Sequence, residues 1–181
     1  MIEAPTPVRR IVTIDGDDGK SVAISDGPVP DVRTDPARPG FSSTRIWITD
    51  ATPVEIARVR DALEPPHTIE PPPRGSVCRI VTLPPDDAFK VGAEDGAAFF
   101  RAMGSPGAST YAAGAPNPYM QRTRTLDFCL VLDGEITLVL DTAEVHLAAG
   151  DTVVQRGTNH AWSNRSNRPC TIAISSHDAA E

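Results

Sequence analysis

Short runs of alternating apolar and polar residues recur along the chain, which is the pattern of strands that bury one face. Residues 9–15 and 20–26 alternate in this way on either side of "GDDG", and together they predict a hairpin. Residues 43–50 alternate again and predict another strand. The Pro- and Gly-rich stretch at 27–40, "GPVPDVRTDPARPG", predicts a connector rather than an element.

A denser set of strands fills the C-terminal half of the chain. After a strand over 76–85, the predicted strands are 119–125, 126–132, 135–141, 144–147, 151–156, 160–164 and 170–175. Many short strands at close spacing predict an all-β sandwich or barrel.

One or two short helices are expected between the strands. The capping box at 52–55 predicts a helix that runs to Leu63. A second helix is expected over 94–104, because its apolar residues recur at helical spacing and a glycine ends it. The Pro-rich stretch between them, "EPPHTIEPPPRG", predicts a loop with His67 at its surface.

One predicted strand pair carries polar residues on the face that should be buried. Side chains alternate along residues 119–132, so the odd-numbered residues share a face. That face carries Gln121, Thr123, Thr125, Asp127 and Cys129. An acid, an amide and hydroxyls make a poor core, so this row predicts the lining of a ligand cavity. The same parity places Arg122 and Arg124 outside, and beyond Phe128 both faces become apolar, as in a strand buried on both sides.

His160 and Trp162 share a face of a later strand, and that face is expected to look into the same cavity. Trp162 suits either the core or a platform for substrate, and Tyr119 suits the cavity mouth. An imidazole, a carboxylate and an amide oxygen, from His160, Asp127 and Gln121, can bind a divalent metal. Without a metal, Asp127 and His160 could form an acid/base pair for isomerisation, dehydration or decarboxylation of a small organic acid. The remaining alternative is a carboxylate that neighbouring polar groups satisfy in a barrel without a metal.

Two segments resemble the two motifs of the cupin superfamily. "LDFCLVLDGEITLVLD" is similar to G-x5-H-x-H-x3,4-E-x6-G, and "AAGDTVVQRGTNHAWSN" is similar to G-x5-P-x-G-x2-H-x3-N. Asp127 stands at the acidic position of the first motif, and Gln121 and Thr123 stand at its paired histidines. Gly150, Gly157, His160 and Asn164 match the second motif, whereas Arg156 replaces its proline and the segment is one residue short. The resemblance covers roughly residues 116–176.

The resemblance implies a cupin-type double-stranded β-helix, or jelly-roll barrel, over residues 76–181. Residues 1–75 are then an N-terminal β-rich arm with a short helix that packs on the barrel or on the partner subunit of a homodimer. A single divalent metal, Zn, Fe, Mn or Ni, is implied at Asp127 and His160, with Gln121 contributing its carbonyl oxygen. Because both motif histidines are absent, the usual four ligands cannot assemble, and a barrel without a metal is the alternative.

Composition narrows the choice of partners. Lys and Arg number 17 against 24 Asp and Glu, a formal net charge of -7, which argues against nucleic acid and anionic membranes as partners. A secretory signal and a spanning segment are not evident, so a soluble, cytoplasmic protein is expected. Cys78, Cys129 and Cys170 are expected to be buried free thiols, since a catalytic Cys129 would need a base beside it.

Three classes of function remain open. The first is an enzyme that uses His160 and Asp127 on a small organic substrate, as an oxygenase, isomerase, decarboxylase or lyase. The second is a non-catalytic module that binds or senses a small ligand. The third is a scaffold barrel, because one fold hosts many unrelated activities.

Overall fold

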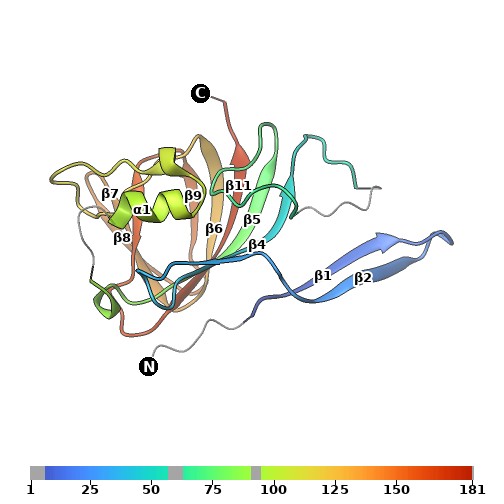
Figure 1. Cartoon of the computed structure of the whole chain (residues 1–181), viewed down its shortest axis with the longest axis horizontal. Helices are drawn as coiled ribbons and strands as arrows, with labels where there is room; N and C mark the ends of the chain where they lie inside the picture. Colours follow the sequence, from blue (N-terminus) through green and yellow to red (C-terminus); the bar gives the residue numbers. More distant parts are fainter. Residues whose placement is uncertain (1–6, 57–62, 91–94, 181) are drawn as a thin grey trace.

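The strands of the chain form three antiparallel sheets within residues 7–56, 63–90 and 95–180, which are the residues that this computed structural model describes (Figure 1). The largest sheet has the order β3-β4-β5-β11-β6-β9, the second has the order β10-β7-β8, and β1 pairs with β2 apart from both. The strands are β1 (Arg9–Asp15), β2 (Ser21–Pro28), β3 (Val32–Thr34), β4 (Ser42–Thr49), β5 (Ser76–Leu83), β6 (Thr125–Asp133), β7 (Glu135–Leu140), β8 (Glu144–Ala148), β9 (Thr152–Arg156), β10 (His160–Ser163) and β11 (Cys170–Asp178).

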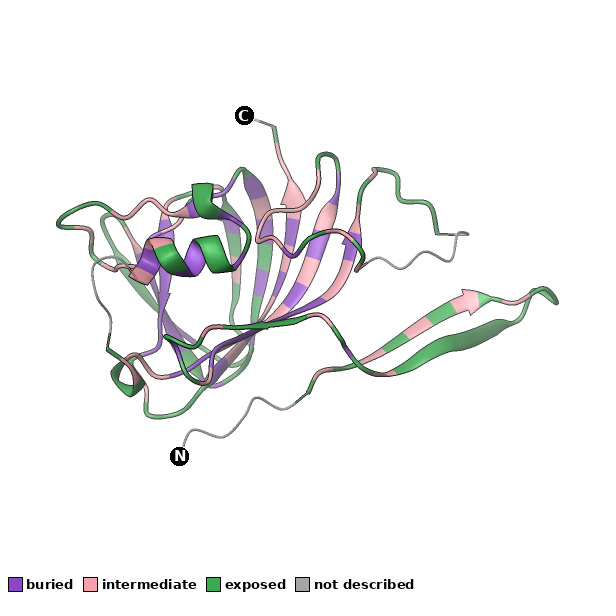
Figure 2. Ribbon diagram, viewed as in Figure 1, coloured by how far each residue is buried: buried purple, intermediate pink, exposed green. Residues whose placement is uncertain are grey.

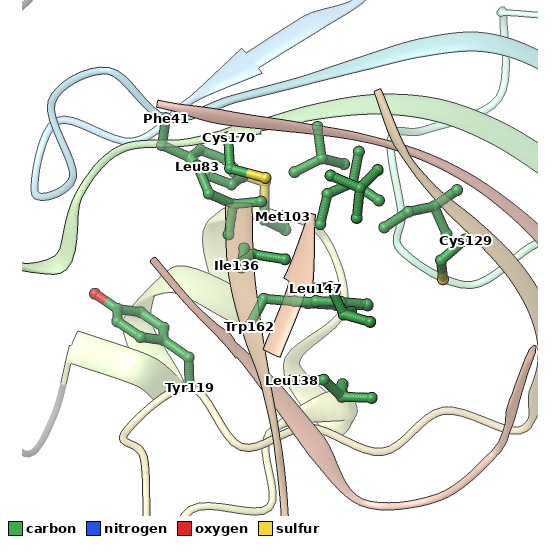
Figure 3. Close-up of a cluster of buried hydrophobic side chains, with 14 of the residues drawn as sticks. Phe41, Leu83, Met103, Tyr119, Cys129, Ile136, Leu138, Leu147, Trp162 and Cys170 are labelled. Atoms are coloured by element: carbon green, nitrogen blue, oxygen red, sulfur yellow. The ribbon is translucent and has the colours of Figure 1, made fainter. Parts of the chain in front are cut away.

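The two larger sheets enclose one hydrophobic core. Leu83 of β5 and Cys170 of β11 lie in the same buried cluster as Leu138 of β7 and Trp162 of β10 (Figure 3). Helix α1 (Asp95–Ala102) adds its aromatic side chains to that cluster. Two sheets of short antiparallel strands around a shared core confirm the predicted all-β barrel.

Burial alternates along the strands of the barrel wall (Figure 2). On β6 the odd-numbered residues from Thr125 to Val131 are buried, whereas Phe128, Leu130 and Leu132 on the opposite face are 50%, 38% and 46% exposed. The prediction that this strand is buried on both faces was therefore wrong. An apolar residue on a strand does not itself supply a second layer to cover it.

The predicted N-terminal hairpin is confirmed as β1 and β2, which project away from the barrel (Figure 1). Its base is held where Arg10 donates a hydrogen bond to the carbonyl of Ile46 at 2.9 Å and lies 5.7 Å from the ring centre of Trp47. Further out, the hairpin exposes Val22 and Ile24. Few contacts of its own chain therefore cover its apolar side chains.

Two predicted elements differ from the structure around the barrel. Residues 119–124 are not part of a strand, since β6 begins at Thr125 and Gln121 forms isolated bridges with Ser109 and His160. The connector at 27–40 contains the short strand β3, which pairs with β4. The bridge from Gln121 to His160 joins segments far apart in the sequence, which local patterns do not encode.

The N-terminal segment also extends the barrel sheet, because β4 pairs along β5. Residues 52–56 are not helical, and the rest of the helix predicted there lies outside the described residues. The second predicted helix is confirmed as α1, although residue 94 is likewise outside the described ranges. The division of the chain at residue 75 stays a prediction. Within the described ranges, no helix has both the length and the apolar character needed to cross a membrane.

His67 is buried, with 5% of its surface exposed, so the prediction of a surface histidine was wrong. The loop that carries it folds back on the barrel, where the imidazole approaches Asp31. Gly104 lies against this loop with a φ of +75°, and a Cβ there would meet the carbonyl oxygen of His67 at 2.1 Å. Glycine at this position therefore permits both the turn after α1 and the close approach of the loop.

Candidate functional site

A cavity of about 70 Å³ lies inside the barrel. Its wall contains seven of the predicted site residues: Tyr119, Gln121, Thr123, Asp127, Cys129, His160 and Trp162. Thr125 is buried but is not part of the wall, and its hydroxyl lies 2.7 Å from that of Thr123. The volume is well below the several hundred Å³ of pockets for drug-sized ligands, so it favours a small ligand.

His160 is the first residue of β10 and is held in the wall by its backbone and its ring. Its N–H and carbonyl exchange hydrogen bonds with Gln121 at 3.0 and 2.8 Å. The ring nitrogen Nδ1 lies 2.9 Å from the carbonyl oxygen of Thr158, which can only accept, so Nδ1 carries the proton. Burial lowers the pKa of His160, against smaller opposing effects of Thr158 and Asp127. The imidazole is therefore neutral, and Nε2 carries a lone pair.

Asp127 lies on β6 opposite Gln155 of β9 and Ser176 of β11. Its side chain is buried, and within the described part of the chain its Oδ1 has no hydrogen-bond partner. The Nε2 of Gln155 is likewise buried without a partner, while its Oε1 accepts a hydrogen bond from the hydroxyl of Thr158 at 2.9 Å. Buried polar atoms without partners are rare in folded proteins and commonly mark places where a ligand or water binds.

Arg38 and Arg79 also line the cavity, and the sequence interpretation missed both. Arg79 lies on the buried face of β5 with Val77 and Val81, so a charged residue interrupting an apolar face was a usable signal. Arg38 comes from the loop before β4, where the sequence carries no such signal. Arg122 and Arg124, which parity had placed outside, are exposed.

Cys129 and Trp162 take structural positions in the wall. Burial raises the pKa of the Cys129 thiol to about 12, so it is protonated and a poor nucleophile near neutral pH. Trp162 belongs to the hydrophobic core and meets the ring of His160 edge to face, with centroids 5.9 Å apart. Asn164 is buried outside the cavity wall, where its amide donates to the carbonyl oxygens of Leu83 and Arg168.

The metal set that the resemblance implies, Asp127 and His160 with the carbonyl oxygen of Gln121, stays a prediction, because only two of its members are of the His, Cys, Asp and Glu types. Within the described ranges, no group of three or more His, Cys, Asp and Glu side chains could hold a metal ion. Thr123 replaces one motif histidine, and its hydroxyl is engaged with Thr125. The guanidinium of Arg79 already acts electrostatically on Asp127 as a fixed positive charge. Asp127, His160 and Gln121 provide at most three ligands, and the amide oxygen of Gln121 is a weak one.

Comparison with known proteins places these residues in a family. Residues 108–175, which include β6 to β10 and most of β11, match the family described as Cupin domain. "Phomopsin biosynthesis cluster protein C'" of Diaporthe leptostromiformis is 59% identical over 49 residues, which are 26% of this chain and 26% of that protein. "Cupin-domain-containing oxidoreductase virC" of Hypocrea virens is 31% identical over 125 residues, which are 66% of this chain and 48% of that protein.

In both relatives the match spans less than half of the relative's own length. Among solved structures, a "Cupin 2 conserved barrel domain protein" from Salinispora arenicola aligns over 82% of each chain, with a TM-score of 0.42 and 15% identity. Proteins with this domain often bind a metal and commonly bind small ligands. The part of the chain that these comparisons assign to a family is therefore residues 108–175, which match a cupin domain.

Proposed function

We propose that the chain binds a small organic molecule in the barrel cavity and catalyses a proton transfer on it, with His160 as the base. The state of His160 carries this proposal. Its Nδ1–H is donated to the carbonyl of Thr158 at 2.9 Å, and burial lowers its pKa. A neutral imidazole in a cavity wall, with one nitrogen lone pair uncommitted, is suited to act as a general base.

Asp127 and Arg79 supply opposite charges for the two products of that transfer. When Nε2 of His160 takes a proton from a substrate C–H, the negative charge of Asp127 favours the imidazolium, in line with its upward effect on the pKa of His160. The electron pair left on the substrate is an anion, which the buried guanidinium of Arg79 stabilises. Return of the same proton at another carbon completes an isomerisation without any change in atoms or electrons.

The names of the relatives support a role in small-molecule metabolism. One is named for the phomopsin biosynthesis cluster and another is named an oxidoreductase. Because each match covers only part of both proteins, the names suggest a setting for the cavity rather than a substrate.

Deuterium exchange tests the proposal. Wild-type protein is incubated in D2O with a panel of small acids, ketones and amides that carry an acidic C–H, and NMR follows incorporation of deuterium. His160→Gln is expected to lower the exchange rate by at least about a hundredfold, whereas His146→Gln, at an exposed position on β8, leaves it unchanged. Binding without exchange would favour the ligand-binding or sensor module, and neither binding nor exchange would favour the scaffold.

A metal-dependent oxidoreductase is the second candidate. It is favoured by the name of one relative and by the hydrogen bond from Nδ1 of His160 to a carbonyl, which is how metal-binding histidines are commonly oriented. Protein purified without chelator is soaked with iron, zinc, manganese or nickel and analysed for bound metal. A stoichiometry near one per chain that is lost in His160→Gln and Asp127→Asn, and kept in His146→Gln, supports this candidate. A stoichiometry near zero removes it.

We also propose that the protein is a homodimer in which the hairpin of one copy packs on the barrel of the other. Val22 and Ile24 of the hairpin are 44% and 47% exposed, and Phe128 and Val154 on the outer face of the main sheet are 50% and 58% exposed. Both surfaces are apolar and exposed in the described chain, so packing one against the other removes apolar area from water. Light scattering after size exclusion is expected to give a dimer mass that Val22→Ser with Ile24→Ser reduces to a monomer. Val145→Ser, on the other sheet, is the matched control.

A further inference from the structure

The cavity wall carries more positive than negative charge. Arg38 and Arg79 are 2% and 6% exposed, and Asp127 is the one carboxylate among the described residues of the wall. Burial keeps His160 neutral and raises the pKa of Tyr119 and of Cys129, so these groups add no charge near neutral pH. The wall itself therefore has an excess of one positive charge, which Asp35 and Asp86 offset in part at Arg38 and Glu70 offsets in part at Arg79 from outside the wall.

Arg38 is surrounded by aromatic rings. The carbon at the centre of its guanidinium lies 4.1 Å from the ring centre of Tyr119 and 5.2 Å from those of Phe41, Phe89 and Phe99. The faces of these rings offset part of the positive charge, but they provide no hydrogen-bond acceptor in the plane of the guanidinium. The N–H groups of that plane therefore remain unsatisfied by the rings.

The unsatisfied nitrogens of Arg38 are Nε and Nη2, which are both buried and have no hydrogen-bond partner among the residues that the structure describes. These two nitrogens form the edge of a guanidinium that binds a carboxylate through two parallel hydrogen bonds. Arg9 uses this same edge, donating from Nε and Nη2 to the two oxygens of Asp26 at 2.6 Å each. The edge that is paired at Arg9 in solvent is thus unpaired at Arg38 inside the barrel.

We infer that the cavity binds a small organic monocarboxylate, whose two carboxylate oxygens accept hydrogen bonds from Nε and Nη2 of Arg38. This inference rests on the proposed function and names the substrate class for the same cavity. A single carboxylate matches the charge excess of one, whereas a phosphate dianion exceeds it. The apolar wall of Leu83, Phe100 and Met103 suits a hydrocarbon body, and the volume of about 70 Å³ limits its size. Nε and Nη2 are buried, so the side chains around them must shift to admit the ligand.

Calorimetric titration with matched acids and amides tests the inference. The probes are short saturated and unsaturated monocarboxylates of about three to six carbons, each paired with its own amide. For the wild-type protein at least one acid is expected to bind, and to bind at least about tenfold more tightly than its amide. Arg38→Met is expected to weaken binding of that acid by about ten- to a hundredfold and to leave the amide unchanged. Arg38→Lys keeps the charge but not the two-nitrogen edge, so its affinity for the acid is expected to lie between those of the wild type and Arg38→Met.

Arg33→Met is the matched control, because Arg33 is an exposed arginine on β3 outside the cavity wall. The inference is overturned if no acid binds more tightly than its amide, or if Arg38→Met binds the acid as the wild type does. If Arg38→Met does not unfold in one cooperative transition, acid and amide binding are measured with Arg38→Lys instead, and the same two outcomes overturn the inference.

The two proposals fail separately. If acid binding depends on Arg38 but deuterium exchange is the same in wild type and His160→Gln, the proton-transfer function is wrong and the ligand class stands. If exchange depends on His160 but proceeds on neutral substrates without any effect of Arg38→Met, the function stands and the ligand class is wrong.

Discussion

Two buried clusters in this molecule contain the same three residue types, but their polar atoms are satisfied very differently. In the loop cluster, Asp31 accepts hydrogen bonds from Nε of Arg45 at 2.5 Å and from Nδ1 of His67 at 3.0 Å. Arg45 also donates to the carbonyl oxygens of Leu63, Pro65 and Pro66 at 2.9, 2.6 and 2.8 Å. The loop cluster thus ties the Pro-rich loop to the barrel.

The cavity cluster of Asp127, Arg79 and His160 has partners for only some of its polar atoms. Oδ1 of Asp127 and Nε of Arg79 are buried without a partner, and Nη2 of Arg79 reaches Ser176 only at 3.3 Å. A cluster that stabilises a fold fills its hydrogen-bonding capacity, whereas a cluster that receives a ligand leaves capacity open. This difference supports a structural role for the loop cluster and the proposed binding role for the cavity cluster.

The largest expected effect comes from breaking the loop cluster. Asp31→Ala leaves the buried guanidinium of Arg45 without its carboxylate, so the free energy of unfolding is expected to fall by about 3–5 kcal/mol. Urea unfolding measures it. Asp26→Ala removes a carboxylate from an equally short but exposed pair with Arg9, and no comparable loss is expected there. Equal losses in the two variants would refute a structural role for the loop cluster.

Removing the charges of the cavity cluster is expected to change the free energy of unfolding in the opposite direction. Arg79→Met combined with Asp127→Leu replaces two incompletely paired buried charges by apolar side chains, which is expected to raise the free energy of unfolding by about 1–4 kcal/mol. The same urea titration measures it. A loss as large as that of Asp31→Ala would mean that the cavity cluster holds the fold together, and the contrast between the two clusters would disappear.

Acid affects both clusters through their histidines. Burial lowers the pKa of His67 and of His160 below the ordinary value of 6.5. In each case the unfolded chain binds a proton more readily than the folded one, so stability is complete above pH 6.5 and is lost as pH falls from there towards the lower folded pKa. The loss is at most about 1.4 kcal/mol per pH unit for each proton.

His160→Gln is expected to reduce that pH dependence by up to one proton and to lower stability near neutral pH by less than His67→Gln does, because the Nδ1–H of His160 donates to the neutral carbonyl oxygen of Thr158 and not to a carboxylate. His67→Gln is expected to lower stability at every pH, since it removes the hydrogen bond to Asp31. Urea unfolding across the acid range compares the two variants. Identical behaviour would show that both histidines have the same role.

The sequence could predict the cavity cluster better than the loop cluster, for a physical reason. Alternation along β6 is a local property of the backbone, so it correctly placed Asp127 and Cys129 on the buried face. The burial of His67 and Arg38 depends on how loops fold back on the barrel, which is decided by contacts between distant segments. The exposure of Phe128 was missed for the same reason, since alternation does not reveal what covers the second face.

The smallest expected effect reports on the coupling between the clusters. The positive charge of Arg79 lowers the pKa of His67, as that of Arg45 does, although burial is the main cause of the lowering. Arg79→Met is therefore expected to raise the pKa of His67 towards 6.5 and so to lessen the share of acid destabilisation that this histidine causes. Titration of the His67 ring signals by NMR measures the shift, and Arg79→Lys, which keeps the charge, is expected to leave the signal unmoved. A pKa that stays constant in both variants would mean that the two clusters act independently, because repulsion between their charges is the direct link through which one can affect the other.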